Sequence, residues 1–145
     1  MLNTQKIPWD KRYQLGIEMI DTQHKKLFDL VNRLYDLEDS KNVKEELRVI
    51  LYEFNMYMQI HFEDEEEYMA SIDYPDLQEH KKLHKDIIDS VNNIIVTPAK
   101  LGIIKSKMKV VAKRALVDHI MNEDTKIKLY VVEKEAEEIF DISDI

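Results

Sequence analysis

Cysteine is absent from the 145-residue chain. Its absence excludes disulfide bonds, thiolate nucleophiles, cysteine-ligated zinc and iron–sulfur clusters. A chain without disulfides fits a reducing compartment, and we expect a cytoplasmic protein.

Helix breakers and long apolar runs are also scarce. Only two glycines and three prolines interrupt 145 residues, which predicts long uninterrupted elements, and elements of this composition are helices. No apolar run is long enough to cross a bilayer, and residues 1–10 lack the apolar stretch of a signal peptide. We therefore expect neither a membrane span nor a leader.

Basic residues are outnumbered by acidic ones, 21 against 29, which gives a net charge of −8. An acidic surface repels phosphate backbones, so nucleic acid is not an expected partner. A chain of this length buries roughly 70% of its unfolded surface, enough for a proper core. We expect a single domain spanning residues 1–145.

Apolar side chains recur at helical spacing in four segments. We expect helices at about 21–37, 43–70, 76–95 and from about 103 to at least 130, the last continuing, bent, to about Phe140. Asn42 and Glu45 are spaced as a capping box for the second helix. Pro75 suits the first position of the third helix.

Helices of similar length joined by short loops favour an all-α fold, an up-down-up-down four-helix bundle. The bundle would span residues 19–140. An irregular N-terminal arm, residues 1–18, would precede it, with Trp9 and Tyr13 as its apolar anchors.

The histidines are the main functional signal. The chain has five, and each lies on the expected apolar stripe of its helix: His24, His61, His80, His84 and His119. A single histidine there would usually be a core residue with one hydrogen bond. Five buried imidazoles without partners would cost roughly 1–3 kcal/mol each, a cost that metal coordination removes. The spacing of four between His80 and His84 also lets two imidazoles grip one ion.

Two carboxylates are candidates to join them. Glu65 lies four residues after His61 and so shares its helix face, whereas we expect most of the acidic run 63–67 to be solvated. After His119, a spacing of four favours Glu123. Asp124 lies about 140° round an ideal helix from His119 and would need a helix distortion. The spacing alone leaves both residues open.

Five imidazoles and two carboxylates are too many ligands for one tetrahedral zinc ion. They suit two six-coordinate ions with shared bridges and one open position. Iron fits this donor set, as do manganese, cobalt and zinc. Two ferrous ions, two carboxylates and one hydroxide carry a net charge of about +1, which a core can tolerate. In a site with so many neutral imidazole ligands, we expect the metal pair to transfer electrons to bound oxygen and to recover them when oxygen leaves.

The sequence resembles the bacterial hemerythrin family over nearly its whole length. The matching elements are Trp9-Asp10, Gly16-Ile17, Ile20-Asp21, His24-Lys25-Lys26-Leu27-Phe28, His61-Phe62, Glu65-Glu66, Met69, Tyr74-Pro75, His80, His84, His119-Ile120 and Asp124. All seven ligand positions of the family are filled.

The resemblance implies a role for each ligand. His80, His84 and His119 would hold one iron, and His24 and His61 the other, which keeps one position open for oxygen. Glu65 and Asp124 would bridge two non-haem iron ions, together with an oxo or hydroxo bridge. The resemblance thus selects Asp124 over Glu123.

The function implied is reversible binding of molecular oxygen by a carrier, store or scavenger that is not an enzyme. The alternatives are a sensor of oxygen, nitric oxide or redox state, or a weak di-iron oxidase or peroxidase. Sensing is disfavoured because the domain fills the chain and leaves no output module. Nitric oxide and small anions are further candidate ligands, and no obligate protein partner is expected.

The surroundings of the site show one departure from the family. Ala115 stands where related proteins often carry a tryptophan, four residues before His119, and we expect this change to reshape the pocket. Eight apolar residues lie one turn from the ligands: Ile20, Leu27, Phe28, Met58, Phe62, Ile87, Leu116 and Ile120. They are core residues first, and they would also keep the site dry and slow autoxidation.

Overall fold

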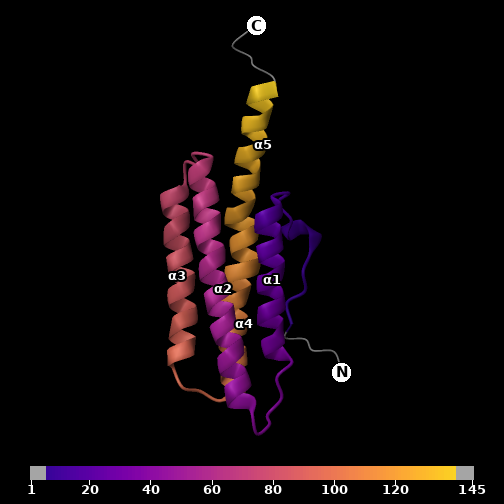
Figure 1. Ribbon diagram of the computed structural model, residues 1–145, viewed down its shortest axis with the longest axis vertical. Helices are drawn as coiled ribbons and strands as arrows, with labels where there is room; N and C mark the ends of the chain where they lie inside the picture. Colours follow the sequence, from indigo (N-terminus) through magenta and orange to yellow (C-terminus); the bar gives the residue numbers. More distant parts are fainter. Residues whose placement is uncertain (1–5, 140–145) are drawn as a thin grey trace.

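The computed structural model describes residues 6–139, and within this range the chain is helical and contains no strand. Three helices, α1 (Glu18–Tyr35), α2 (Val43–Ser71) and α3 (Leu77–Val96), lie side by side with a fourth rod (Figure 1). The rod consists of α4 (Leu101–Ala112), two π-helical segments, η2 (Lys113–Asp118) and η3 (Ile120–Asp124), and α5 (Thr125–Ile139). None of the described helices combines the length and apolar character that crossing a membrane requires.

The four predicted helical segments are confirmed. Their observed boundaries differ from the predicted ones by no more than three residues. The scarcity of glycine and proline explains this agreement, because almost no helix breaker interrupts the helical spacing of the apolar residues within a helix. The predicted end near Phe140 and the first five residues of the N-terminal arm lie outside the described residues.

Two details of the helix ends were predicted wrongly. Asn42 precedes α2 but makes no side-chain capping bond. Its backbone, at φ −102° and ψ 9°, is not extended as a capping residue requires, so the predicted capping box does not form. Pro75 lies in the turn before α3, which begins two residues later at Leu77.

The N-terminal arm is fastened to α1 by a carboxylate and by aromatic packing. Asp21 is buried, and its two oxygens accept hydrogen bonds from the backbone N–H groups of Leu15 and Gly16 at 2.7 and 2.9 Å. Gly16 has φ +80°, a conformation that side chains disfavour. Nearby, Trp9 packs edge-on against Phe28 with ring centroids 5.4 Å apart, which confirms its role as an anchor.

Most of the core lies between α1, α2, α3 and the fourth rod. A large apolar cluster fills the half of the bundle towards α4, and a smaller one, around Met69, Tyr74 and Ile127, fills the other end. The buried polar side chains of the bundle lie along the same interior. The fold therefore places polar groups from several helices at a depth that water does not reach.

Candidate metal centre

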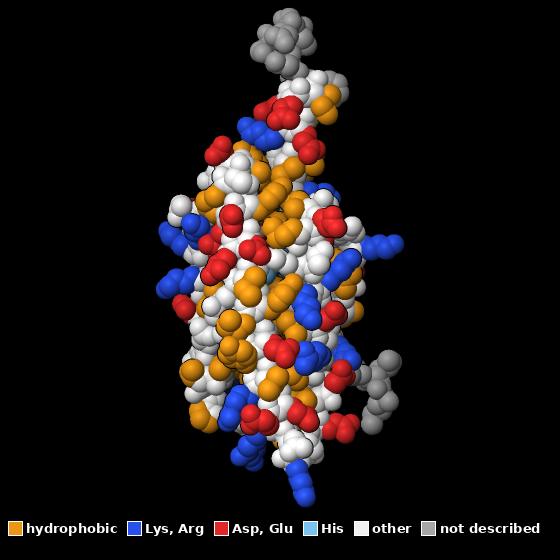
Figure 2. All heavy atoms as spheres, viewed as in Figure 1, with side chains coloured by type: hydrophobic (Ala, Val, Ile, Leu, Met, Phe, Trp, Pro, Cys, Tyr) orange, Lys and Arg blue, Asp and Glu red, His pale blue; other side chains and the backbone are white. Residues whose placement is uncertain are grey.

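All seven predicted site residues lie inside the bundle. The five histidines are at most 6% exposed, and Glu65 and Asp124 are fully buried. Figure 2 shows the consequence, since histidine is almost invisible on this face among the lysine, arginine and acidic side chains. Each of the three helices and the fourth rod contributes side chains to the site: His24 from α1, His61 and Glu65 from α2, His80 and His84 from α3, and His119 and Asp124 from the fourth rod.

These side chains form two sets of potential ligands that share both carboxylates. One set contains three histidines, His80, His84 and His119, and the other contains two, His24 and His61. Within each set, the ligand atoms lie within 4.8 Å of one another.

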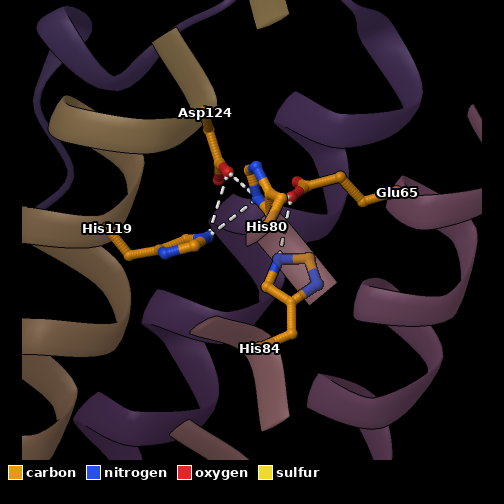
Figure 3. Close-up of side chains that lie close together, drawn as sticks. All are labelled: Glu65, His80, His84, His119 and Asp124. Carbon is orange, nitrogen blue, oxygen red and sulfur yellow. Dashed lines mark hydrogen bonds and ion pairs between the residues drawn. The ribbon is translucent and has the colours of Figure 1, made fainter. Parts of the chain in front are cut away.

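In the three-histidine set, the Nε2 atoms converge on one oxygen of each carboxylate (Figure 3). Oε1 of Glu65 lies 3.0 Å from His80 Nε2 and 3.1 Å from His84 Nε2. Oδ1 of Asp124 lies 3.0 Å from His80 Nε2 and 3.1 Å from His119 Nε2. The Nε2 atoms of His80 and His119 are themselves only 3.1 Å apart.

The two-histidine set uses the other oxygen of each carboxylate. Oε2 of Glu65 lies 3.2 Å from His61 Nε2 and 3.5 Å from His24 Nε2. Oδ2 of Asp124 lies 3.0 Å from His24 Nε2. Each carboxylate therefore presents one oxygen to each set, which is the arrangement of a bridge between two cations.

The spacing of these atoms fits metal ions. Two ligand atoms about 2.1 Å from an ion and at right angles to each other lie about 3.0 Å apart. Not all of these short contacts are hydrogen bonds. Four buried atoms lack a hydrogen-bond partner among the described residues: His24 Nε2, Glu65 Oε2 and both carboxylate oxygens of Asp124. Buried carboxylate oxygens without donors are costly, and a cation between the ligand atoms removes that cost.

The outer nitrogens of two histidines are held by polar partners. His61 Nδ1 donates to Gln23 Oε1 at 2.7 Å, and Gln23 Nε2 in turn donates to Asp64 at 2.8 Å, which fixes the amide orientation. His84 Nδ1 donates to Glu66 at 2.8 Å. In the neutral ring, a proton on Nδ1 leaves the Nε2 lone pair free to bind a metal.

Two histidine pKa values are raised by the carboxylates. Burial lowers the pKa of His24, but Asp124 and Glu65 together outweigh burial and raise it to about 9. The pKa of His80 reaches about 9 against burial for the same reason. The pKa of His61 is lowered instead, because burial exceeds the attraction of Glu65. The metal-free cluster thus attracts protons to His24 and His80, and a bound metal would displace them.

Both carboxylates remain ionised. Burial raises the pKa of Glu65, but its interactions with His61, His24 and His80 outweigh burial and hold this pKa well below its usual range. Burial and the neighbouring Glu65 raise the pKa of Asp124. His119 and His24 lower it by more than that, so the net shift of this pKa is downward. Two anionic carboxylates in one dry core make a strong electrostatic demand for cations.

A helix distortion brings Asp124 into the cluster. The rod is π-helical on either side of His119, in η2 and η3. A π-helix has backbone hydrogen bonds between residues five apart, and its wider turn brings the residue at i+5 closer to the helix side that residue i faces than in an α-helix. Glu123, the choice of an ideal helix, is partly exposed and pairs with Lys126 at 3.4 Å. The structure therefore brings Asp124, and not Glu123, to the other site residues.

The eight apolar neighbours predicted around the site are all buried. Phe62 stacks on the His84 ring with centroids 3.8 Å apart and planes within 7°. Ala115 is also buried and belongs to the main core. Gln23 was not predicted as a histidine partner, and Glu66 was expected to lie in the solvated acidic run. Two signals were available in the sequence: Gln23 is an amide directly beside the candidate ligand His24, and Glu66 is a carboxylate one residue after Glu65.

Comparison with known proteins identifies the family of the chain. The family model for the hemerythrin HHE cation binding domain matches residues 15–130. A bacteriohemerythrin from Campylobacter jejuni is 32% identical over 126 residues, which cover 86% of this chain and 95% of that protein. A myohemerythrin from Theromyzon tessulatum is 34% identical over 120 residues, which cover 83% of this chain and 89% of that protein. Because the family model matches most of the chain, and because relatives above 30% identity cover most of its length, this chain belongs to the hemerythrin family.

Proposed function

We propose that the chain holds two non-haem iron ions in the bundle core and binds molecular oxygen reversibly. The observation that carries the proposal is the pair of ligand sets, which share Glu65 and Asp124 but differ by one histidine. Family membership supports iron as the metal and oxygen as the ligand. The proposed bundle runs up-down-up-down, so that facing helices can hold paired metals between them.

In this proposal, His80, His84 and His119 would bind one iron ion, and His24 and His61 would bind the other. The two-histidine set offers one protein ligand fewer, so oxygen would have an open position on that side. Glu65 and Asp124, whose two oxygens face different ligand sets, would serve both ions, and an oxo or hydroxo bridge would complete the cofactor. When bound, a pair of iron ions would supply the redox chemistry that reversible oxygen binding requires.

The surrounding residues protect that exchange. Ile20 and Met58 are fully buried, and Phe62 covers the ring of His84. This apolar wall excludes water, which would otherwise promote loss of reduced oxygen species and oxidation of the iron. Gln23 and Glu66 hold the rings of His61 and His84 so that Nε2 faces the ions.

We propose binding and not turnover as the activity. The seven side chains of the two ligand sets would all hold metal, and the adjacent carboxylate of Glu66 is engaged by His84. General acid–base chemistry on a substrate would require a titratable group beside the metal that is free to exchange protons.

The proposal is tested by stoichiometry. The chain is loaded with ferrous iron without oxygen, and iron per chain is measured after removal of excess metal. Oxygen uptake is then measured with an oxygen electrode. We expect two iron ions and one oxygen molecule per chain. One iron per chain, or continued oxygen consumption beyond one molecule, would contradict the proposal.

A further inference from the structure

Helix α5 presents two apolar faces, and only one of them contacts the bundle. On the inner face, Ile127 is fully buried and Tyr130 is partly buried. The hydroxyl of Tyr130 donates to the backbone carbonyls of Ile72 and Asp73, both at 3.1 Å. These contacts fasten the first half of α5 to the loop between α2 and α3.

The outer face carries an apolar stripe of four exposed residues. Leu129, Val132 and Ile139 are 60%, 52% and 74% exposed, and Ala136 is exposed as well. Their spacings of three, four and three residues are those of the a and d positions of a coiled coil. At about 100° per residue, this stripe lies on nearly the opposite side of α5 from Ile127.

The stripe continues onto a part of α5 that projects past the other helices (Figure 1). Every residue from Val132 to Ile139 is exposed. The matched hemerythrin domain ends at residue 130, so this projection lies beyond it. An unsupported helical segment this short is marginal in water. Its apolar residues at a and d positions would be buried if a second helix packed along them.

We propose that the outer face of α5 binds the same face of a second copy of this chain, in parallel and in register. The stripe points away from its own bundle, so the two bundles would lie on opposite sides of the helix pair. Because the same apolar stripe of each copy would meet the other, the dimer would have two-fold symmetry. No metal ion takes part, so the inference is independent of the proposed function.

Charge favours the parallel direction. With Leu129 and Ala136 at a positions, Lys128 occupies a g position and Glu133 the following e position. A parallel pair places each Lys128 beside Glu133 of the other copy, twice. A fully overlapping antiparallel pair would instead set Glu133 against Glu133 and Glu135 against Glu135. Like charges there oppose the antiparallel arrangement.

Two heptads make a small interface, below the roughly 1,000 Å² of stable complexes. The dimer should therefore be weak and its population should rise with protein concentration. Sedimentation velocity on the 145-residue chain, over micromolar to millimolar concentrations, measures this directly. We expect a sedimentation coefficient that rises with concentration, and a constant monomer value throughout the range would overturn the proposal.

Two variants matched in charge identify the interface. Val132→Glu and Lys134→Gln each lower the net charge by one, but Lys134 lies on the side of α5 opposite the stripe. We expect Val132→Glu to weaken dimerisation at least tenfold and Lys134→Gln to change it less than threefold. Equal effects of the two variants would overturn the assignment. Circular dichroism of both variants reports whether the bundle is intact.

The absence of cysteine allows a second, direct test. In a parallel pair in register, a cysteine at position 132 faces its own copy, so Val132→Cys should form a disulfide-linked dimer under mild oxidation. Lys134→Cys is the control and should cross-link at least tenfold more slowly. Similar rates for the two positions would contradict the parallel arrangement, whatever the iron content of the protein.

Discussion

Replacing Asp124 by asparagine is the sharpest test of the ligand geometry. The change keeps the side-chain shape and removes the negative charge. Oδ1 and Oδ2 of Asp124 lie 3.0–3.1 Å from His80, His119 and His24, so one residue serves both ligand sets. Removing one charged partner from a buried pair costs about 3–5 kcal/mol. We therefore expect iron affinity to fall by at least about a hundredfold.

Glu123→Gln is the matched control one residue earlier. Glu123 lies at the surface, where its contact with Lys126 contributes at most about 1 kcal/mol. Its substitution should change iron affinity less than about fivefold. The assay is an anaerobic ferrous titration against a competing chelator, with circular dichroism to verify folding. A large loss in Glu123→Gln and none in Asp124→Asn would refute the role of the π-helical segments.

Three further predictions concern stability and the outer partners of the site. Stripping the metal should lower the melting temperature by about 5–10 °C, since ligand at a hundred times Kd adds about 2.7 kcal/mol; an unchanged value in calorimetry would contradict a folded-state metal site. In the metal-free protein, His24 and His80, with pKa values of about 9, stabilise the fold fully below pH 6.5. That contribution, at most about 3 kcal/mol each, should disappear as pH rises through 9. Urea denaturation that gives the same free energy of unfolding at pH 6 and pH 10 would argue against it. Gln23→Ala removes the partner of His61 and should weaken iron binding about 10–100-fold, whereas the exposed control Gln78→Ala should have no effect in the same titration.

The fold was largely readable from the sequence because its helices are long and rarely interrupted. Periodicity locates their apolar faces, and the observed boundaries follow it closely. The ends were harder: Asn42 has the side chain of a capping residue, but its backbone is not extended. The conformation of such a residue depends on how the loop meets the bundle, which local spacing does not encode.

The helix pattern indicated the five histidines and Glu65, whereas only the family resemblance selected Asp124. Each histidine lies on an apolar stripe, so burial of all five followed from the helix pattern. Asp124 did not, because a π-helical segment arises from a shift in backbone hydrogen bonds that periodicity does not reveal. The outer face of α5 was equally hidden, since its apolar residues divide between two faces and sequence alone does not say which one meets the bundle.

The central claim is tested most directly by an optical spectrum followed through cycles of oxygen. The iron-loaded protein is reduced anaerobically, freed of reductant, exposed to air, and then returned to vacuum. The account predicts a visible charge-transfer band that appears with oxygen, disappears under vacuum and returns over several cycles. A band that never forms, or one that forms once and decays irreversibly, would contradict reversible oxygen binding.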